Sequence, residues 1–336
     1  MTRPRDIFLK ALTRDRAERP ATGSATSIVT TDLMEKVGVH FPEAHLDPAD
    51  MAALAAAGHT ELGFDNVMPL FSVWHESSAM GCGVDWGDDN HMPACRDALF
   101  RVGEEIVVPP DLLERPGCAV PLEAIRLLKQ ELGDDVAVVG KVFGPWTLGY
   151  HVFGVQEFLI HTILDPAAIK KAMETLKEMT VRFARAQIDA GADALCLGDH
   201  ATRDLCSPEA YRDFLAEIHR ELGERIDCPL ILHICGDTSD RIEFIRKTGL
   251  ACFHFDSKVP AALARELAGD GLSLMGGTSN LSEVRSGTAE SIARDVREKI
   301  EAGVDIIGPE CAVPLDAPYR NMKVLTREVK QRTTSV

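Results

Sequence analysis

The chain has 336 residues, 45% hydrophobic and 26% charged, an ordinary composition for a globular protein and a length that suits one large α/β barrel. Its formal charge of −16 argues against nucleic-acid partners, which require a basic surface. No apolar run approaches membrane-spanning length and no signal-peptide core follows Met1, so we expect a cytoplasmic protein with no membrane partner. Nine scattered cysteines indicate reduced thiols rather than a disulfide framework.

The first third of the chain predicts four separate elements before a less regular region. In order, they are a short helix, a strand, a helix and a second strand, at residues 4–14, 25–29, 47–58 and 62–68. Residues 71–117 are rich in turn signals, so they are expected to form an inserted excursion of loops and short strands over the rim of the fold.

From residue 120 onward, predicted helices and strands alternate regularly. The helices are at 120–132, 166–190, 208–222, 238–247, 260–267, 288–302 and from 318 onward, and the strands at 136–142, 193–197, 230–235, 250–256, 273–276 and 304–307. This βα repetition with about eight strands predicts a single (β/α)8 TIM barrel domain over residues 1–336, with an open doubly wound sheet as the alternative.

The strand at 230–235 ends on two side chains that bind metals. Residues two apart on a strand share a face, so His233 and Cys235 converge on one point. Cys311 follows the strand at 304–307 and offers a third ligand. One His and two Cys suit a zinc ion with an open fourth position, which water or a carboxylate such as Glu310 could fill, whereas a purely structural zinc site usually has four protein ligands. His254, two residues past Cys252, is expected one layer deeper, as a hydrogen-bonded core residue.

Other polar residues gather at predicted strand ends, where barrel enzymes carry their chemistry. Asp199 and Asp256 are catalytic candidates, with helix capping as the alternative for each, and Glu76 is a third candidate or a salt-bridge partner. An anionic substrate group is expected at the turn after Cys235, where backbone amides would meet a helix N-terminus and a nearby cation. The expected substrate-binding residues are Gly236, Asp237, Thr238, Arg203 and Asn280.

Motifs across nearly the whole chain resemble one family. They are at 41–48, 76–82, 205–214, 233–237, 256–258, 276–280 and 308–314. Together they resemble the corrinoid-dependent methyltransferase branch of the uroporphyrinogen decarboxylase superfamily, whose zinc signature, His-x-Cys and a distant Cys, is matched by His233, Cys235 and Cys311. The Arg-Gln-Ala-Gly-Arg segment of true decarboxylases does not occur before Ser24, and the family's Glu-Ala-Glu and Gly are replaced here at 76–78 and at Glu310.

The resemblance implies a TIM barrel that moves a methyl group from a methyl-Co(III) corrinoid (methylcobalamin), carried by a small partner protein, to a small thiol such as coenzyme M. It also implies Zn2+ at His233, Cys235 and Cys311. No Asp-x-His-x-x-Gly corrinoid-binding segment is found, so the corrinoid is expected on another polypeptide. Zinc acidifies a bound thiol, whereas a pterin nitrogen needs no metal, which favours the thiol acceptor.

Two alternative functions remain open at this point. The first is methyl transfer between a corrinoid protein and tetrahydrofolate, with the pterin held by Asp199, Asp256 and Asn280. The second is a non-catalytic, zinc-stabilised accessory protein that binds corrinoid proteins.

Overall fold

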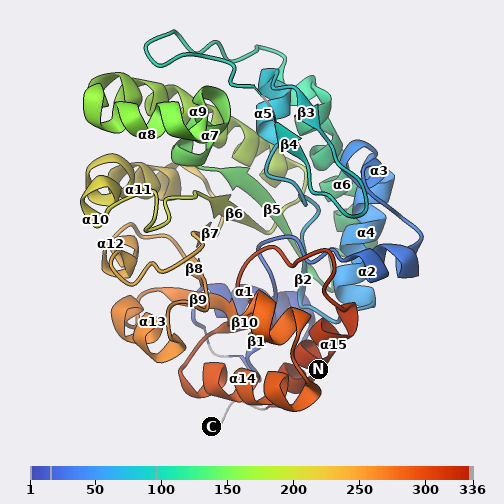
Figure 1. Ribbon diagram of the computed structural model, residues 1–336. Coiled ribbons are helices and arrows are strands. Elements are labelled where there is room, and N and C mark those ends of the chain that lie inside the picture. The colour runs from blue at the N-terminus through green and yellow to red at the C-terminus, as the bar shows by residue number, and fades with distance from the viewer. Residues whose placement is uncertain (1, 16, 96, 333–336) are drawn as a thin grey trace.

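The structure is a computed structural model that describes residues 2–15, 17–95 and 97–332. Eight parallel strands form one curled sheet in the order β1-β10-β9-β8-β7-β6-β5-β2, with helices around it (Figure 1). The strands are β1 (Ala21–Thr22), β2 (Asn66–Val67), β5 (Ala137–Phe143), β6 (Ala194–Gly198), β7 (Leu230–His233), β8 (Cys252–Phe255), β9 (Ser273–Thr278) and β10 (Ile306–Pro309). This confirms the predicted (β/α)8 barrel.

Apart from α1, which precedes β1, the helices lie between or after the strands in sequence, and helices surround the barrel (Figure 1). They are α1 (Pro4–Leu12), α2 (Thr31–Val37), α3 (Glu43–Leu46), α4 (Pro48–Thr60), α5 (His75–Met80), α6 (Pro116–Leu132), α7 (Pro145–Phe153), α8 (Val155–Leu164), α9 (Pro166–Asp189), α10 (Pro208–Ala210), α11 (Ala216–Arg225), α12 (Ile242–Arg246), α13 (Ala261–Ala268), α14 (Ala289–Glu301) and α15 (Tyr319–Lys330). Short 3-10 and π segments lie at Leu112–Glu114, Tyr211–Leu215 and Asn280–Arg285.

The barrel closes where its two shortest strands, β1 and β2, meet; we call this place the seam. The Asp65 amide donates to the Thr22 carbonyl oxygen (2.8 Å). The Asn66 side chain accepts from the Ser24 amide (3.0 Å) and donates to the Ser24 carbonyl (2.8 Å). At the seam, hydrogen bonds of the Asn66 side chain therefore replace part of the backbone hydrogen bonding of a strand ladder.

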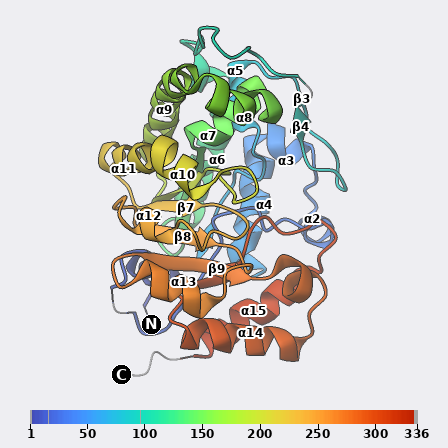
Figure 2. The same cartoon turned by 60° about the vertical axis from the view of Figure 1, so that its left-hand side comes forward.

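Helix α1 covers the end of the barrel at which the strands begin. The Arg5 amide donates to the Asp135 carbonyl just before β5, and the Ser273 hydroxyl at the start of β9 donates to the Ala11 carbonyl (both 2.8 Å). The opposite end, where the strands finish, stays available for side chains that follow them. In both views α7, α8 and α9 lie at one end of the molecule and α13, α14 and α15 at the other (Figure 1, Figure 2).

The segment 71–117 contains more helix than its turn signals predicted. It holds α5, the short antiparallel pair β3 (Val84–Asp85) and β4 (Ala94–Cys95), the 3-10 turn and the first residues of α6. The pair is tied to the barrel body through Asp89, whose carboxylate accepts from the Phe41 amide at 3.1 Å.

Two predictions about the elements were wrong. The first strand is at Ala21–Thr22 rather than 25–29, because those later residues are buried without joining the ladder; the Ser27 carbonyl instead accepts from the Val313 amide (2.8 Å). The helix predicted at 238–247 begins only at Ile242. Helix α7 was missed because all nine of its residues are buried, which leaves no polar face to give a helical period. Helix α8, in which only Phe158 is buried, was also missed.

Buried residues from Ile7 to Val329 form one hydrophobic cluster, which favours the expected single-domain organisation. Among the described residues, no helix is both long enough and apolar enough to cross a membrane.

Candidate metal centre and active site

His233, Cys235 and Cys311 meet at the mouth of the barrel. His233 ends β7 and Cys311 follows β10, and β8 and β9 separate these strands in the sheet, so the side chains meet across the mouth. His233 Nε2 lies 3.1 Å from Cys235 Sγ and 3.4 Å from Cys311 Sγ, and the two sulfur atoms are 3.0 Å apart. Among the described residues, these three side chains form a group that could bind a metal ion, because their ligand atoms all lie within 4.8 Å of one another.

The donor atoms of this triad fit zinc. The sulfur–sulfur hydrogen bond and the neighbouring imidazole hold the pKa of Cys311 well below its ordinary value, and the pKa of Cys235 is raised because it donates to that thiolate. Two thiols this close cannot both lose their protons unless a cation lies between the two sulfur atoms. Two sulfurs and one imidazole form a ligand set that zinc prefers.

His233 is oriented by β8. Its Nδ1 donates to the His254 carbonyl oxygen at 3.3 Å, which leaves the Nε2 lone pair facing the two cysteines. The His254 ring lies 4.6 Å from the His233 ring, and His254 Nε2 donates to the Pro309 carbonyl at 2.8 Å. The hydrogen-bonded core role predicted for His254 is confirmed. His254 pairs in register with His233, two residues before Asp256.

Glu310 and Asn280 hold the loop that carries Cys311. Glu310 accepts from the Asn280 amide (2.7 Å) and from the Ser257 amide (2.9 Å), so both carboxylate oxygens are used within the protein rather than offered to a metal. The Asn280 side chain donates to the Ala312 carbonyl at 2.8 Å, while its buried Oδ1 has no partner. Asn280 thus keeps one free hydrogen-bond acceptor.

Asp256 performs a similar positioning task for Cys235. Its carboxylate accepts from the Gly236 amide at 2.8 Å and from the Lys258 amide at 2.9 Å. It therefore fixes the turn directly after Cys235. These contacts favour a positioning role for Asp256 over the catalytic role predicted from the sequence.

The anion site expected around Gly236, Asp237, Thr238 and Arg203 is not supported by the structure. The Arg203 guanidinium donates to the Asp237 carboxylate at 2.7 Å, so its charge is already paired, and its side chain is 55% exposed. The Gly236 amide is used by Asp256, and α12 begins four residues after Thr238 and is five residues long. The sequence carried the signals of a helix N-terminus, but the chain first makes a turn there.

Asp199 lies at the end of β6 as predicted, but it is fully buried. It accepts from the Thr147 amide in the first turn of α7 (2.8 Å) and is paired with His219 (3.0 Å). His219 in turn bonds the Tyr211 hydroxyl at 2.9 Å. These contacts indicate that Asp199 joins α7, β6 and α11, and they give no support to a catalytic role.

Glu76 is buried against the end of β5. Its Oε1 accepts from the Phe143 amide at 3.0 Å, and its Oε2 is buried with no partner. Burial raises the pKa of Glu76 to about 8, partly opposed by the Phe143 hydrogen bond and the Lys141 charge. The carboxyl is therefore protonated at neutral pH and can donate a hydrogen bond.

Lys141 was missed by the sequence reasoning. It is a charged residue within the otherwise apolar strand β5, which is buried along its whole length, and it is itself only 4% exposed. A lone charge in a fully buried strand was the signal that could have found it.

The pH dependence of stability tests the environment of Glu76. The unfolded chain ionises Glu76 above about pH 4.5, but the folded chain does so only near pH 8, so the unfolded state binds fewer protons in this window. We expect the free energy of unfolding to fall from pH 5 to pH 8 by about 2–4 kcal/mol more in the wild type than in Glu76→Gln. Urea denaturation at several pH values measures this. The control is Glu298→Gln on the exposed face of α14; equal pH slopes for the wild type and Glu76→Gln would contradict the prediction.

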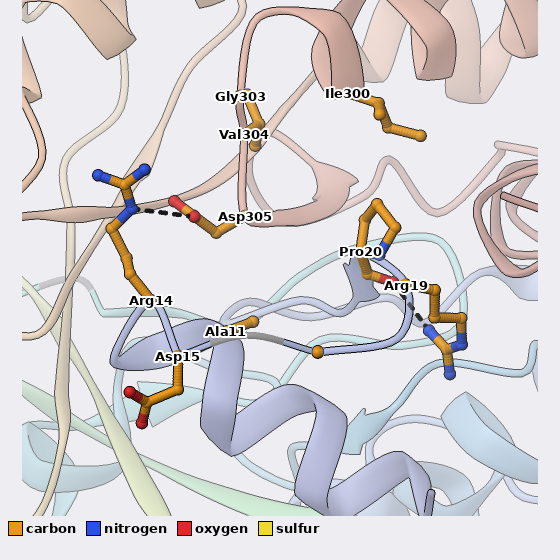
Figure 3. A pocket seen from close by; sticks show the side chains of 10 residues that line it. Ala11, Arg14, Asp15, Arg19, Pro20, Ile300, Gly303, Val304 and Asp305 are labelled. Atoms are coloured by element: carbon orange, nitrogen blue, oxygen red, sulfur yellow. Dashed lines mark hydrogen bonds and ion pairs between the residues drawn. The ribbon is translucent and has the colours of Figure 1, made fainter. Parts of the chain in front are cut away.

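A pocket at the other end of the barrel is not a competing active site. It lies where α1 and the residues before β10 meet, and Figure 3 shows Arg14 facing Asp305 across it. Arg14 Nε is 3.2 Å from Asp305, and Arg19 makes two 2.7 Å bonds to Asp65. Its arginines are paired with acidic partners, and chemistry in such barrels belongs at the opposite face.

Comparison with known proteins agrees with the geometry. The uroporphyrinogen decarboxylase (URO-D) family model matches residues 3–332. A methylated-thiol–coenzyme M methyltransferase of Methanosarcina mazei is 33% identical over 304 residues, 90% of this chain and 82% of the relative. The methylcobamide:CoM methyltransferase MtaA of Methanosarcina barkeri (strain Fusaro) is 29% identical over 321 residues, 95% of each chain.

Solved structures extend the comparison to the fold. A methyltransferase from Methanosarcina mazei superposes with a TM-score of 0.95 at 28% identity, covering 98% of this chain and 99% of its own. A B12-independent methionine synthase from Shewanella sp. W3-18-1 shares only the fold, with a TM-score of 0.65 at 14% identity over 94% of this chain and 96% of its own. The family match, the relatives and the barrel lead to one conclusion: this chain is an enzyme of the uroporphyrinogen decarboxylase family and belongs to its methyltransferase branch.

Proposed function

We propose that this enzyme transfers a methyl group from a methyl-Co(III) corrinoid, carried by a separate small protein, to a small thiol such as coenzyme M. The observation that carries the proposal is the convergence of one imidazole nitrogen and two cysteine sulfurs at the barrel mouth, within 4.8 Å of one another. The relatives named methylcobamide:CoM methyltransferases support the choice of donor and acceptor.

In this proposal His233, Cys235 and Cys311 hold one zinc ion. With zinc bound, the site would lower the pKa of the acceptor thiol. The thiolate sulfur would then form the bond to the methyl carbon as the cobalt–carbon bond breaks, and cobalt would keep that electron pair as Co(I). The protein's own groups prepare the site: the His254 carbonyl fixes the His233 tautomer, and Asp256 and Glu310 fix the turns around the two cysteines. A cytoplasmic location fits nine cysteines that are all free.

The structure weakens the tetrahydrofolate alternative. That alternative relies on Asp199, Asp256 and Asn280 to hold a pterin, but Asp199 is fully buried and both it and Asp256 are engaged by protein groups. Only Asn280 keeps a free buried acceptor. The alternative of a non-catalytic accessory protein is disfavoured, because the chain belongs to a branch of enzymes.

Thiol binding and turnover test the proposal together. We expect the zinc-loaded enzyme to demethylate free methylcobalamin when 2-mercaptoethanesulfonate is present, seen as a change in the corrinoid absorption spectrum. We also expect about one proton to be released per thiol bound, and none in the metal-free protein, because only the metal holds the acceptor as thiolate. Calorimetry in buffers of different ionisation enthalpy counts the protons. If methyltetrahydrofolate binds and the thiol does not, the folate alternative replaces this proposal.

A further inference from the structure

Lys141 is oriented into the barrel by strand register. Phe143, Gly198, His233 and His254 pair successively across β5 to β8, so their side chains share the face on which His233 reaches the mouth. Lys141 is two residues before Phe143 and therefore has the same face. It pairs with the fully buried Cys196 on β6. Its side chain thus starts one layer beneath the His233 level, inside the barrel.

Lys141 is a buried residue whose ammonium has no counter-ion among the described residues. It lies 5.0 Å from the centroid of the Phe143 ring, which brings it up to the level of the strand end. Across the described parts of the chain it makes no hydrogen bond and no ion pair within 4.0 Å, although the residue is 4% exposed. A buried charge without a partner is costly, and an anion that binds beside it removes that cost.

Other groups around Lys141 extend from Glu76 to the metal triad. The Phe143 ring is 5.9 Å from the His200 ring. Burial is the main cause that lowers the pKa of His200 to about 4, and the Lys141 charge adds to this effect. On the other side, Glu76 feels the same charge yet forms no ion pair with it, and its Oε2 has no partner. With its pKa near 8, Glu76 is a neutral donor at pH 7 and does not repel an anion.

The arginines Arg241 and Arg203 are less suited than Lys141 to bind an anion, because both already have partners. Arg241 is fully buried, but its guanidinium is bonded to the Cys206 carbonyl (2.7 Å) and to Asp240 (2.8 Å), while Arg203 is paired with Asp237. Lys141 combines burial, lack of a partner and orientation toward the site.

We propose that Lys141 binds the anionic end of the acceptor thiol and is the residue by which the enzyme prefers a thiol with a sulfonate or carboxylate a few bonds from its sulfur. This inference rests on the proposed function and deepens it. The sulfur lies at the triad, and the anionic end lies over Phe143, with the Lys141 ammonium on one side and the Glu76 carboxyl as a second hydrogen-bond donor.

A pair of thiols with the same mercaptoethyl group, one of which carries a sulfonate, tests this without any mutation. We expect 2-mercaptoethanesulfonate to bind the zinc-loaded wild type about 10–100-fold more tightly than 2-mercaptoethanol, as measured by calorimetry, because a charge-assisted hydrogen bond discriminates by this factor. Lys141→Met should lose the preference for the sulfonate while keeping its affinity for 2-mercaptoethanol and one zinc per chain. Lys141→Arg should keep part of the preference.

The matched control is Lys323→Met. Lys323 also lies over an aromatic ring, 5.9 Å from the Tyr319 centroid, but on the exposed surface of α15, so its removal should change neither thiol affinity. Equal binding of the two thiols by the wild type, or an unchanged preference in Lys141→Met, overturns the role of Lys141 and leaves the methyltransfer proposal in place. Failure of the proposed function gives a different result, in which the wild type binds neither thiol.

Discussion

Replacing Cys235 with serine is expected to prevent binding of the proposed zinc ion and to abolish the proposed methyl transfer. A serine hydroxyl stays protonated at neutral pH, and it cannot replace a thiolate that lies 3.0 Å from Cys311 Sγ and 3.1 Å from His233 Nε2. Loss of one of the three ligands should weaken zinc binding by more than about 100-fold. Changing even a residue that only hydrogen-bonds to a ligand lowers metal affinity by about 10–100-fold. Metal analysis after dialysis and the methylcobalamin assay measure the two effects.

Cysteines elsewhere supply matched controls for this experiment. Cys228 is half-buried before β7 and Cys118 is fully buried in α6, and neither is part of the triad. Cys228→Ser and Cys118→Ser should therefore keep one zinc per chain and full activity. A Cys235→Ser protein that retains a full complement of zinc would remove Cys235 from the ligand set.

Gly308→Ala is expected to give the largest loss of stability. A Cβ built on Gly308 would lie 1.8 Å from the Gly23 carbonyl oxygen and 3.0 Å from its carbonyl carbon, which are backbone atoms that cannot rotate away. β1 and β10 must separate to admit the methyl group, although Thr22 and Ile307 pair there. We expect the free energy of unfolding to fall by about 3 kcal/mol or more, measured by urea denaturation.

Gly271 is the control for this substitution. It lies in the exposed turn before β9, where a Cβ would meet nothing within 4 Å. Gly271→Ala should leave stability nearly unchanged. Equal stability of the two variants would mean that β1 and β10 are not packed as tightly as the structure indicates.

Patterns local in sequence predicted the part of the site that depends on strand geometry. His233 and Cys235 share a face because side chains alternate along β7, and the regular βα rhythm places every strand end at the same rim. Cys311 is 76 residues beyond Cys235. Its contact with His233 and Cys235 was therefore predicted from the barrel fold and the family resemblance rather than from sequence spacing.

Hydrogen-bond partners far apart in sequence could not be predicted in this way. The turn around Asp237 looked like an anion site because its pairing with Arg203 is invisible in the sequence. Asp199 looked like a rim carboxylate, but His219 and the Thr147 amide take up its oxygens. Lys141 was not among the predicted site residues, because its position inside the barrel depends on the register of β5 with β6.

The seam has a consequence for how the enzyme is made. β1 finds its ladder partner in β10, and Cys311 follows β10 directly, so a ribosome must deliver nearly the whole chain before the barrel can close. Assembly of the His233, Cys235 and Cys311 triad and closure of the barrel then depend on the same late segment. A translation product that stops before Gly308 carries His233 and Cys235 without Cys311, and its sheet is not closed.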